Sequence, residues 1–371
     1  MTTRYCGPGG NDASDGLTWA NRKLTLTGLE DSPVEAGDIC YVAPGTYREL
    51  LTCDVDGSSG SPITYIGDYT GANTDGTGGV VRITGSDDDQ SIARENCVAN
   101  TKSYRTFQGI AFGEASTACI GITTTAADVT NLIVDECYFQ NYAYGIYVSH
   151  TTNTLKSSTI KNSYFYCKND IYLSVTSGAQ IDANNVIENN ILRIGERGNA
   201  CFFNRVIGGT IRNNLFQSGD VGVLVQNATD NTVDMIVNNN IFVGINTAFL
   251  GVTGNFGITE DYNNLYSVAI ARSNVATGAN SNTFPGLFDS RWFFELVNGG
   301  TLLTPFDLAS YSELVDVAGT SPTTADMRGT TVQGTQREWG ALEYDSTLDI
   351  EAGSGGGGAV KIIPITGKVG L

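Results

Sequence analysis

The sequence predicts an all-β protein, a solenoid in which each turn is one coil of short parallel strands. A six-residue phrase recurs at residues 134–139, 160–165, 187–192, 211–216, 237–242 and 261–266. Its last residues, 139, 165, 192, 216, 242 and 266, are 26, 27, 24, 26 and 24 positions apart, and no helix-length segment separates them. A regular period of this length, filled with strands alone, is typical of a solenoid. The 45 glycines and 17 tyrosines, with only 16% charged residues, agree with a turn-rich β chain.

Asparagine dominates the third and fourth positions of the phrase, where two strands must turn into each other. Asparagine adopts the left-handed backbone conformation readily, and its side-chain amide can bond to nearby backbone. Stacked at about 4.8 Å, the spacing of parallel strands, such side chains can also bond from coil to coil. We therefore expect a structural ladder rather than a glycan-binding site from these residues, which are Asn162, Asn189, Asn213, Asn239 and Asn263.

The second position of the phrase carries Asp135, Lys161, Glu188 and Arg212 on four successive coils. The signs alternate, so each charge should face opposite charges above and below, which opposes a slip in register. Alternation also disfavours a pair of neighbouring acids of the kind that a glycosidase needs. The pattern therefore predicts an ion ladder. A further strand is expected after each phrase, over residues 145–148, 170–173, 200–203, 222–225 and 248–250.

The two ends of the chain carry specific phrases in a recognisable order. Residues 5–12 and 15–20 are glycine-rich turns, and Ala-Gly-Asp-Ile-Cys-Tyr-Val at 36–42 precedes Gly-Thr-Tyr at 45–47. This opening resembles that of right-handed parallel β-helix proteins of the pectate-lyase-like class. The phrases at 285–288, 314–319, 326–329 and 340–344 resemble the usual terminus of the same class, with Leu342 in place of its middle tyrosine.

The resemblance implies a single right-handed parallel β-helix with an N-terminal cap and an irregular C-terminal closure. We expect the cap and first coil at residues 1–60, the body at 61–290, the closure at 291–345 and a glycine-rich tether with a docking segment at 346–371. The apolar run after the glycines could add as an edge strand to a partner, or fold back on its own body. Its docking residues would be Val360, Ile362, Ile363 and Ile365.

Composition excludes several classes of function. The formal net charge of −18, with no basic patch evident in the sequence, opposes binding to polyanions such as nucleic acid or acidic polysaccharide. The eight cysteines form no Cys-x-x-Cys pair, which favours buried thiols over disulfides. The chain opens without an apolar signal segment, and no apolar run reaches the roughly 18 residues of a membrane span. We therefore expect a protein that is made in the cytoplasm and does not cross a membrane.

Few residues suggest chemistry. His150 is the only histidine, which excludes a multi-histidine metal site, and we expect no metal and no cofactor. A polysaccharide lyase of the resembled class would need an arginine or lysine base beside carboxylates that hold calcium. The best cluster of mixed charge is Arg193, Glu196 and Arg197, with Asp170 and Asp220 at similar edges of neighbouring coils. No catalytic motif of the class matches these residues, so no residue is assigned as catalytic.

Two hypotheses about function follow. The first is a non-enzymatic structural protein of a bacteriophage particle, similar to β-helical decoration, head-fibre and tail-spike proteins. It would be a homotrimer in the virion, bound through its C-terminal tail to the major capsid protein or another virion protein, with polysaccharide as a candidate ligand. The alternative is a carbohydrate-active enzyme, either a polysaccharide lyase or a spike glycosidase, with Arg193, Glu196 and Arg197 as its candidate cluster.

Overall fold

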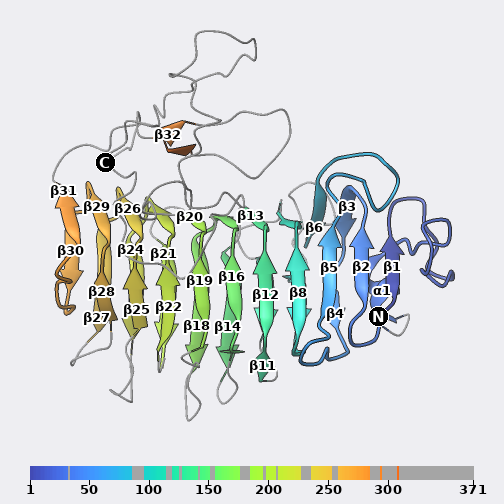
Figure 1. Cartoon of the computed structure of the whole chain (residues 1–371), viewed down its shortest axis with the longest axis horizontal. Helices are drawn as coiled ribbons and strands as arrows, with labels where there is room; N and C mark the ends of the chain where they lie inside the picture. Colours follow the sequence, from blue (N-terminus) through green and yellow to red (C-terminus); the bar gives the residue numbers. More distant parts are fainter. Residues whose placement is uncertain are drawn as a thin grey trace, which may run out of the picture.

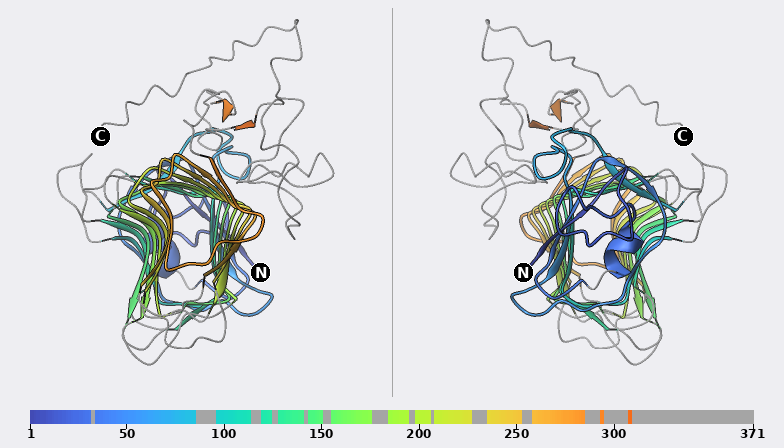
Figure 2. Two further views of the ribbon diagram at one scale, coloured as in Figure 1. Left: turned by 90° about the vertical axis from the view of Figure 1, so that its left-hand side faces the viewer. Right: turned by 90° about the vertical axis from the view of Figure 1, so that its right-hand side faces the viewer.

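The chain is a right-handed parallel β-solenoid in which successive coils stack along one axis (Figure 1). The structure is a computed structural model, and it describes residues 1–31, 34–85, 96–113, 119–124, 128–140, 143–150, 155–175, 184–194, 198–205, 208–226, 235–252, 258–284, 293–294 and 307–308. The all-β fold class and the resemblance to the pectate-lyase-like β-helix are both confirmed. Seen along the axis, the coils superimpose around a filled interior (Figure 2).

Three parallel sheets form the walls of the solenoid. The first sheet contains β1 (Thr3–Cys6), β2 (Ile39–Val42), β5 (Ile63–Gly67), β8 (Arg105–Gln108), β12 (Leu132–Asp135), β16 (Thr159–Lys161), β19 (Val186–Glu188), β22 (Gly209–Arg212), β25 (Met235–Asn238) and β28 (Ile258–Asp261). The second contains β3 (Gly45–Arg48), β6 (Val81–Thr84), β9 (Ala111–Phe112), β13 (Tyr138–Gln140), β17 (Tyr164–Tyr166), β20 (Ile191–Arg193), β23 (Leu215–Gln217), β26 (Ile241–Val243), β29 (Asn264–Tyr266) and β31 (Asn282–Phe284).

The third sheet contains β4 (Leu51–Cys53), β7 (Asn96–Asn100), β10 (Ile120–Thr124), β14 (Tyr144–His150), β18 (Asn169–Val175), β21 (Asn199–Asn204), β24 (Val221–Gln226), β27 (Thr247–Val252) and β30 (Ile270–Ser273). The remaining elements are the helix α1 (Leu26–Asp31), the parallel pair β11 (Val129–Thr130) and β15 (Leu155–Lys156), and the antiparallel pair β32 (Phe293–Phe294) and β33 (Asp307–Leu308).

Each coil therefore has three strands. The six-residue phrase is itself two strands, one in the first sheet and one in the second, joined by a bend at its third position. The strand predicted after each phrase is the third, and β14, β18, β21, β24 and β27 confirm it. The short strands of the phrase were hard to separate because only a single corner divides them.

The interior is filled by inward side chains from each strand, stacked on their counterparts in the next coil. Alternation along a strand sends neighbouring side chains to opposite faces. Phe139 and Phe165 stack with ring centroids 4.5 Å apart, and Phe216 and Phe242 with centroids 4.4 Å apart. This inward column of the second sheet consists of Tyr47, Ile83, Phe112, Phe139, Phe165, Leu192, Phe216, Phe242 and Leu265. All eight cysteines are buried as well.

The third position of the phrase makes the bend between the first and second sheets. Asn162, Asn189, Asn213 and Asn239 have φ values of 51°, 57°, 55° and 57°. These lie in the left-handed region, which asparagine adopts at lower cost than most residues. In the last phrase the corresponding residue is Tyr262, with a φ of 54°, and Asn263 lies one place further along the coil.

The hydrogen-bonded ladder is made one residue after the bend. Each backbone N–H at this buried corner donates to a side-chain oxygen of the next coil. The bonds run from Cys137 to Ser163 (3.1 Å), Ser163 to Asn190 (3.0 Å), Asn190 to Asn214 (2.9 Å), Asn214 to Asn240 (2.9 Å), Asn240 to Asn263 (3.0 Å) and Asn263 to Ser281 (3.0 Å). Asn263 is thus the one predicted ladder residue that lies in this column, and the other predicted residues are the bends beside it.

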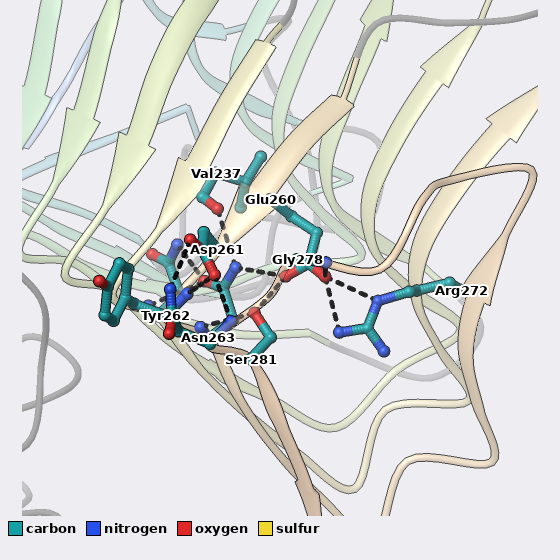
Figure 3. Close-up of polar contacts among 10 residues, drawn as sticks. Val237, Glu260, Asp261, Tyr262, Asn263, Arg272, Gly278 and Ser281 are labelled. Carbon is teal, nitrogen blue, oxygen red and sulfur yellow. Dashed lines mark hydrogen bonds and ion pairs between the residues drawn. The ribbon is translucent and has the colours of Figure 1, made fainter.

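The last phrase begins one residue earlier than the sequence predicted. Val237 pairs with Glu260 and Phe242 with Leu265, so the final step of the repeat is 265 − 242 = 23 residues rather than 24. The shift escaped detection because Glu260 occupies an inward position that is apolar in the preceding coils. Its carboxylate accepts bonds from Asn263 (2.9 Å), Ser281 and the Gly278 N–H (2.6 Å), and pairs with Arg272 at 2.7 Å (Figure 3).

The second position of the phrase lies on the outer surface of the first sheet in the expected order. Asp135, Lys161, Glu188 and Arg212 are neighbours along the column. Two ion pairs are formed, Lys161 with Asp135 at 3.3 Å and Arg212 with Glu188 at 2.6 Å. The pairs are partly exposed, so each contributes about 1 kcal/mol or less, and their main effect is on register.

A second buried ion pair lies at the N-terminal end of the coils. Arg105 donates to both carboxylate oxygens of Glu30 on α1, at 2.6 and 3.0 Å, and Tyr65 donates its hydroxyl to the same carboxylate. The two charged side chains are almost fully buried. α1 lies at this end of the solenoid (Figure 2). Arg105 therefore joins the helix to β8, and Tyr65 joins it to the neighbouring strand β5.

Replacing Asn214 with alanine should destabilise the fold by about 3 kcal/mol, because buried donors and acceptors lose their partners. The Asn214 side chain accepts from the Asn190 N–H (2.9 Å) and donates to the carbonyls of Ile187 (3.0 Å) and Arg212 (2.9 Å). The control is Asn246→Ala at an exposed turn, which should change stability by no more than about 0.5 kcal/mol. Thermal and denaturant unfolding measure both, and equal effects would contradict the role of the ladder.

Glu30→Gln should lower stability by about 3 to 5 kcal/mol at neutral pH, because it leaves Arg105 buried without its counter-charge. Burial raises the pKa of Glu30, but the hydrogen bonds and charge of Arg105 and the Tyr65 hydroxyl outweigh it, so the net pKa is lowered. The stabilisation is therefore present above the ordinary glutamate pKa and is lost as pH falls through the lowered one.

The difference in Tm between the parent protein and Glu30→Gln should accordingly shrink as the pH falls below about 4. Glu35→Gln, at an exposed position, is the control and should leave the pH profile unchanged. A difference in Tm that stays constant down to strongly acidic pH would show that the charge of Glu30 has no part in holding α1.

Candidate functional site

A group of tyrosines and arginines lies on the outer face of the second sheet. It consists of Arg82 on β6, Tyr138 on β13, Tyr164 and Tyr166 on β17, and Arg193 on β20, and it is called the tyrosine–arginine patch below. These residues alternate with the buried inward column, so their side chains point to the outside of the solenoid. Stacking of the coils places them next to one another although they are up to 111 residues (193 − 82) apart in the chain.

The patch has a defined geometry. The rings of Tyr138 and Tyr164 stack with centroids 5.0 Å apart and an interplanar angle of 8°. The guanidinium of Arg193 lies over the ring of Tyr166, 5.2 Å from its centroid, and its charge is close enough to Tyr164 to lower the pKa of that phenol. Arg193 and Tyr166 are exposed, whereas Tyr164 is largely buried. The guanidinium is therefore held in place by two aromatic side chains while part of it faces solvent.

The two stacked tyrosines are uncharged at neutral pH. Burial, together with the neighbouring Tyr164, raises the pKa of Tyr138 to about 12, against the opposing effect of Arg82 and Arg193. Burial also raises the pKa of Tyr164, while the charge and hydrogen bond of Arg193 lower it. The environments of the two phenols therefore differ in degree, because Arg193 opposes the rise in pKa at both and burial raises the pKa of both.

The patch is positive within a strongly negative protein. The outward positions of β13, β17, β20 and β23 contain no carboxylate, and they are Tyr138, Gln140, Tyr164, Tyr166, Ile191, Arg193, Leu215 and Gln217. A guanidinium presents paired N–H groups that match a carboxylate, and a tyrosine offers both a flat apolar ring and a hydroxyl. Tyr166 and Arg193 are the exposed members of this face, Tyr138, Gln140 and Gln217 are partly exposed, and Tyr164, Ile191 and Leu215 are buried. The accessible part can therefore bind an anionic group at the Arg193 guanidinium, beside the ring of Tyr166.

The structure brings one member of the predicted cluster, Arg193, into this patch. Glu196 and Arg197 lie outside the described residues, as do the docking residues Val360, Ile362, Ile363 and Ile365. Only the backbone of His150 is described, at the end of β14. Tyr138 and Tyr164 were missed because the fifth position of the phrase was interpreted as filling a strand face, and Tyr166 lies just after the phrase. A tyrosine replaces isoleucine or leucine there in two successive coils, and that was the available signal.

Asp170 and Asp220, predicted at similar edges, differ sharply. Asp170 is aligned with Gly145 and Gly222 of other coils. A Cβ added to Gly145 would contact the inward ring of Phe165, and one added to Gly222 would contact that of Phe242. The Asp170 carboxyl therefore faces the interior and is fully buried, bonded to the N–H of Cys167 at 3.1 Å. Burial raises the pKa of Asp170 well above its usual range, so the interior favours the uncharged form of this carboxyl. Asp220 is partly exposed.

Two features are absent from the described part of the chain. No group of three or more His, Cys, Asp or Glu side chains is placed to hold a metal ion. No helix there is long and apolar enough to span a membrane. The prediction that the protein uses no metal stays a prediction.

No family model and no curated protein matches the sequence. Solved structures do match the fold. The pectate lyase Pel9A is 16% identical with a TM-score of 0.55, over 93% of this chain and 97% of that chain. The GH136 lacto-N-biosidase from Eubacterium ramulus is 12% identical with a TM-score of 0.54, over 71% of this chain and 56% of that chain. At these identities the likeness shows a shared parallel β-helix fold.

The expectation that the chain is not an enzyme is wrong on these comparisons, because the matching folds are those of a polysaccharide lyase and a glycosidase. That expectation depended on the absence of a catalytic motif in the sequence. A motif is a poor guide in this fold, since residues that share a face come from separate coils. The virion location, the homotrimer and the capsid partner stay predictions.

Asp170→Asn should stabilise the protein at neutral and alkaline pH. A carboxyl with a raised pKa favours folding below its ordinary pKa, and that contribution is lost as pH rises through the raised value. The Tm of the parent protein should therefore fall from about pH 5 upward relative to that of the variant, which cannot ionise. Asp220→Asn is the control at the exposed edge. Parallel pH profiles for Asp170→Asn and the parent would rule out a buried titrating carboxyl.

Proposed function

We propose that the protein binds an acidic, uronate-containing polysaccharide at the tyrosine–arginine patch and cleaves it by β-elimination. The observation that carries this proposal is the contact of Arg193 with Tyr164 and Tyr166 on a face whose outward positions lack carboxylates. The fold shared with a pectate lyase over nearly the whole chain supports the reaction class. The net charge of −18 makes a local positive patch necessary for any anionic substrate.

The guanidinium of Arg193 would pair with the uronate carboxylate. β-Elimination removes the proton on the carbon next to that carboxylate, and negative charge then develops on the carboxylate oxygens. A fixed cation at this place stabilises the charge as it forms, which lowers the barrier. The ring of Tyr166 keeps the guanidinium oriented, because the two are in contact at 5.2 Å.

The stacked tyrosines would transfer the protons. Tyr164 is uncharged at neutral pH because its pKa is raised, and in its phenolate form, which becomes populated as the pH rises, it would accept the proton next to the carboxylate. The released electron pair forms the carbon–carbon double bond, and the bond to the leaving glycosidic oxygen breaks. Tyr138, with a pKa of about 12, keeps its proton at neutral pH and donates it to that oxygen. Proton exchange with water restores both side chains.

Activity should be lost when either function is removed. Tyr164→Phe should reduce kcat about 10²- to 10⁴-fold, the usual contribution of general acid–base catalysis. Arg193→Ala should reduce kcat/KM about 10²-fold or more, and Arg193→Lys should recover little because it cannot pair bidentately. The assay follows ultraviolet absorbance of the unsaturated product from polygalacturonate, alginate and other uronate polymers.

The matched control is Arg22→Ala, which removes an arginine stacked 4.3 Å from the ring of Trp19, away from the patch. It should leave turnover unchanged. The rate should also rise with pH through the alkaline range, because the pKa of Tyr164 is raised and its phenolate is the base. If the protein binds uronate polymers tightly but forms no unsaturated product, it is a binding protein and the proposed cleavage is refuted. Failure to bind any of them would refute the site.

A virion location is a separate proposal that this chemistry leaves open, since its support is the sequence resemblance to phage β-helical proteins. If the chain forms the expected homotrimer, light scattering on the purified protein should give three times the 39.3 kDa of one chain. A mass of one chain at all concentrations would count against the trimer.

A further inference from the structure

We infer that the third sheet carries a second glycan-binding surface, which binds an uncharged, linear polysaccharide independently of the tyrosine–arginine patch. The surface is the aromatic strip on the outer face of this sheet, formed by Tyr147, Tyr172, Phe202, Leu224 and Leu250. These residues occupy one position in five successive coils. They therefore form a straight row parallel to the axis of the solenoid.

The aromatic part of the strip is rigid and partly accessible. The rings of Tyr147 and Tyr172 stack at 5.2 Å, and those of Tyr172 and Phe202 at 4.3 Å with an interplanar angle of 5°. Tyr144 meets Tyr172 edge-on at 5.2 Å and widens the row. The two stacked tyrosines and Leu224 are half-buried, so their outer edges form part of the surface. Burial also raises the pKa of Tyr172, which keeps its hydroxyl uncharged.

A polar column runs beside the strip, two residues further along each strand. It consists of Ser149, Ser174, Asn204 and Gln226. The amide of Asn204 donates to the Ser174 hydroxyl at 3.2 Å and to the Val175 carbonyl at 3.3 Å, which fixes its orientation. The Asn204 Oδ1 is buried and has no hydrogen-bond partner in the described part of the chain, and Ser174 is buried as well, so Ser149 and Gln226 are the partly exposed members of this column. At the other end of the strip, the hydroxyl of Thr123, on a residue only 4% exposed, is likewise without a partner there.

The chemistry of the two columns selects the ligand. The strip and the polar column contain no charged residue on β14, β18, β21 or β24, although the whole chain carries a net charge of −18. An anionic polymer would gain no ion pair here, and a cationic one would meet no carboxylate. A pyranose presents an apolar ring face and a rim of hydroxyls, which match an aromatic row beside a row of amides and hydroxyls.

The periodicity of the surface favours a polymer. Successive coils repeat at about 4.8 Å, the spacing of parallel strands, which is comparable with the length of one sugar residue. A linear chain along the axis can therefore make the same contact with each coil. A second copy of this protein is a less suitable partner for the strip. Its own repeat would match the strip in only one alignment, and its net charge of −18 would repel that of the first copy.

Binding to cello-oligosaccharides, xylo-oligosaccharides and mixed-linkage β-glucan tests the inference by calorimetry and affinity electrophoresis. The parent protein should bind at least one of them saturably, and Tyr172→Ala should weaken that binding about tenfold, as expected for loss of an aromatic anchor. Tyr41→Ala is the matched control, because Tyr41 stacks on Tyr5 at 6.1 Å on the outer face of the first sheet. It should bind like the parent.

Leu224→Lys provides a second variant that keeps the ring stack intact and places a charge on the strip. It should weaken binding to a similar extent with an unchanged Tm. Arg193→Ala should leave binding of the uncharged glycans unaffected, so this inference and the proposed function can fail separately. No binding of any uncharged glycan at millimolar concentration would overturn the inference. So would equal weakening by Tyr41→Ala, or a concentration-dependent dimer that Tyr172→Ala abolishes.

Discussion

The hydrogen bond from a buried backbone N–H to the side-chain oxygen of the next coil is the interaction on which this structure depends. At the corner between the first and second sheets the chain turns inside the protein, where water cannot satisfy its N–H groups. Asn190, Asn214 and Asn240 each accept this bond and pass the amide contact to the following coil. Because an acceptor in the wrong coil position would leave a buried donor unpaired, the ladder fixes the alignment of each coil on the next.

This fixed alignment turns every outward position into a column along the axis, and the columns are where ligands can be bound. The ion ladder, the tyrosine–arginine patch and the aromatic strip occupy three different sheets but are built in the same way. Each takes one or two residues from each of several coils, so its chemistry depends on which residue types recur at the same positions. A solenoid can therefore carry several binding surfaces without any loop that is dedicated to them.

The repeat was readable from the sequence because the bend demands asparagine and the inward positions demand apolar side chains. The sequence-based prediction was wrong at positions where a residue of another type is stabilised by a partner that is distant in the sequence. Glu260 stands in an apolar position, stabilised by Arg272, and displaced the expected phrase by one residue. The partner of Glu30 is Arg105, 75 residues away, which no local pattern can reveal. Tyr138 and Tyr164 look like core residues in the sequence, and only the alternation along β13 and β17 shows that they face outward.

The charged residues also explain where the packed core ends. One inward column of the first sheet runs from Arg4 through apolar and aromatic side chains to Glu260. Arg4 pairs with Asp38 at 2.8 Å, and Glu260 with Arg272 at 2.7 Å. Buried ion pairs add little net stability, but an unpaired charge in the same place would be costly. Another coil stacked on either end would have to cover these groups, so the pairs favour one length of continuous apolar core over a longer or shifted one.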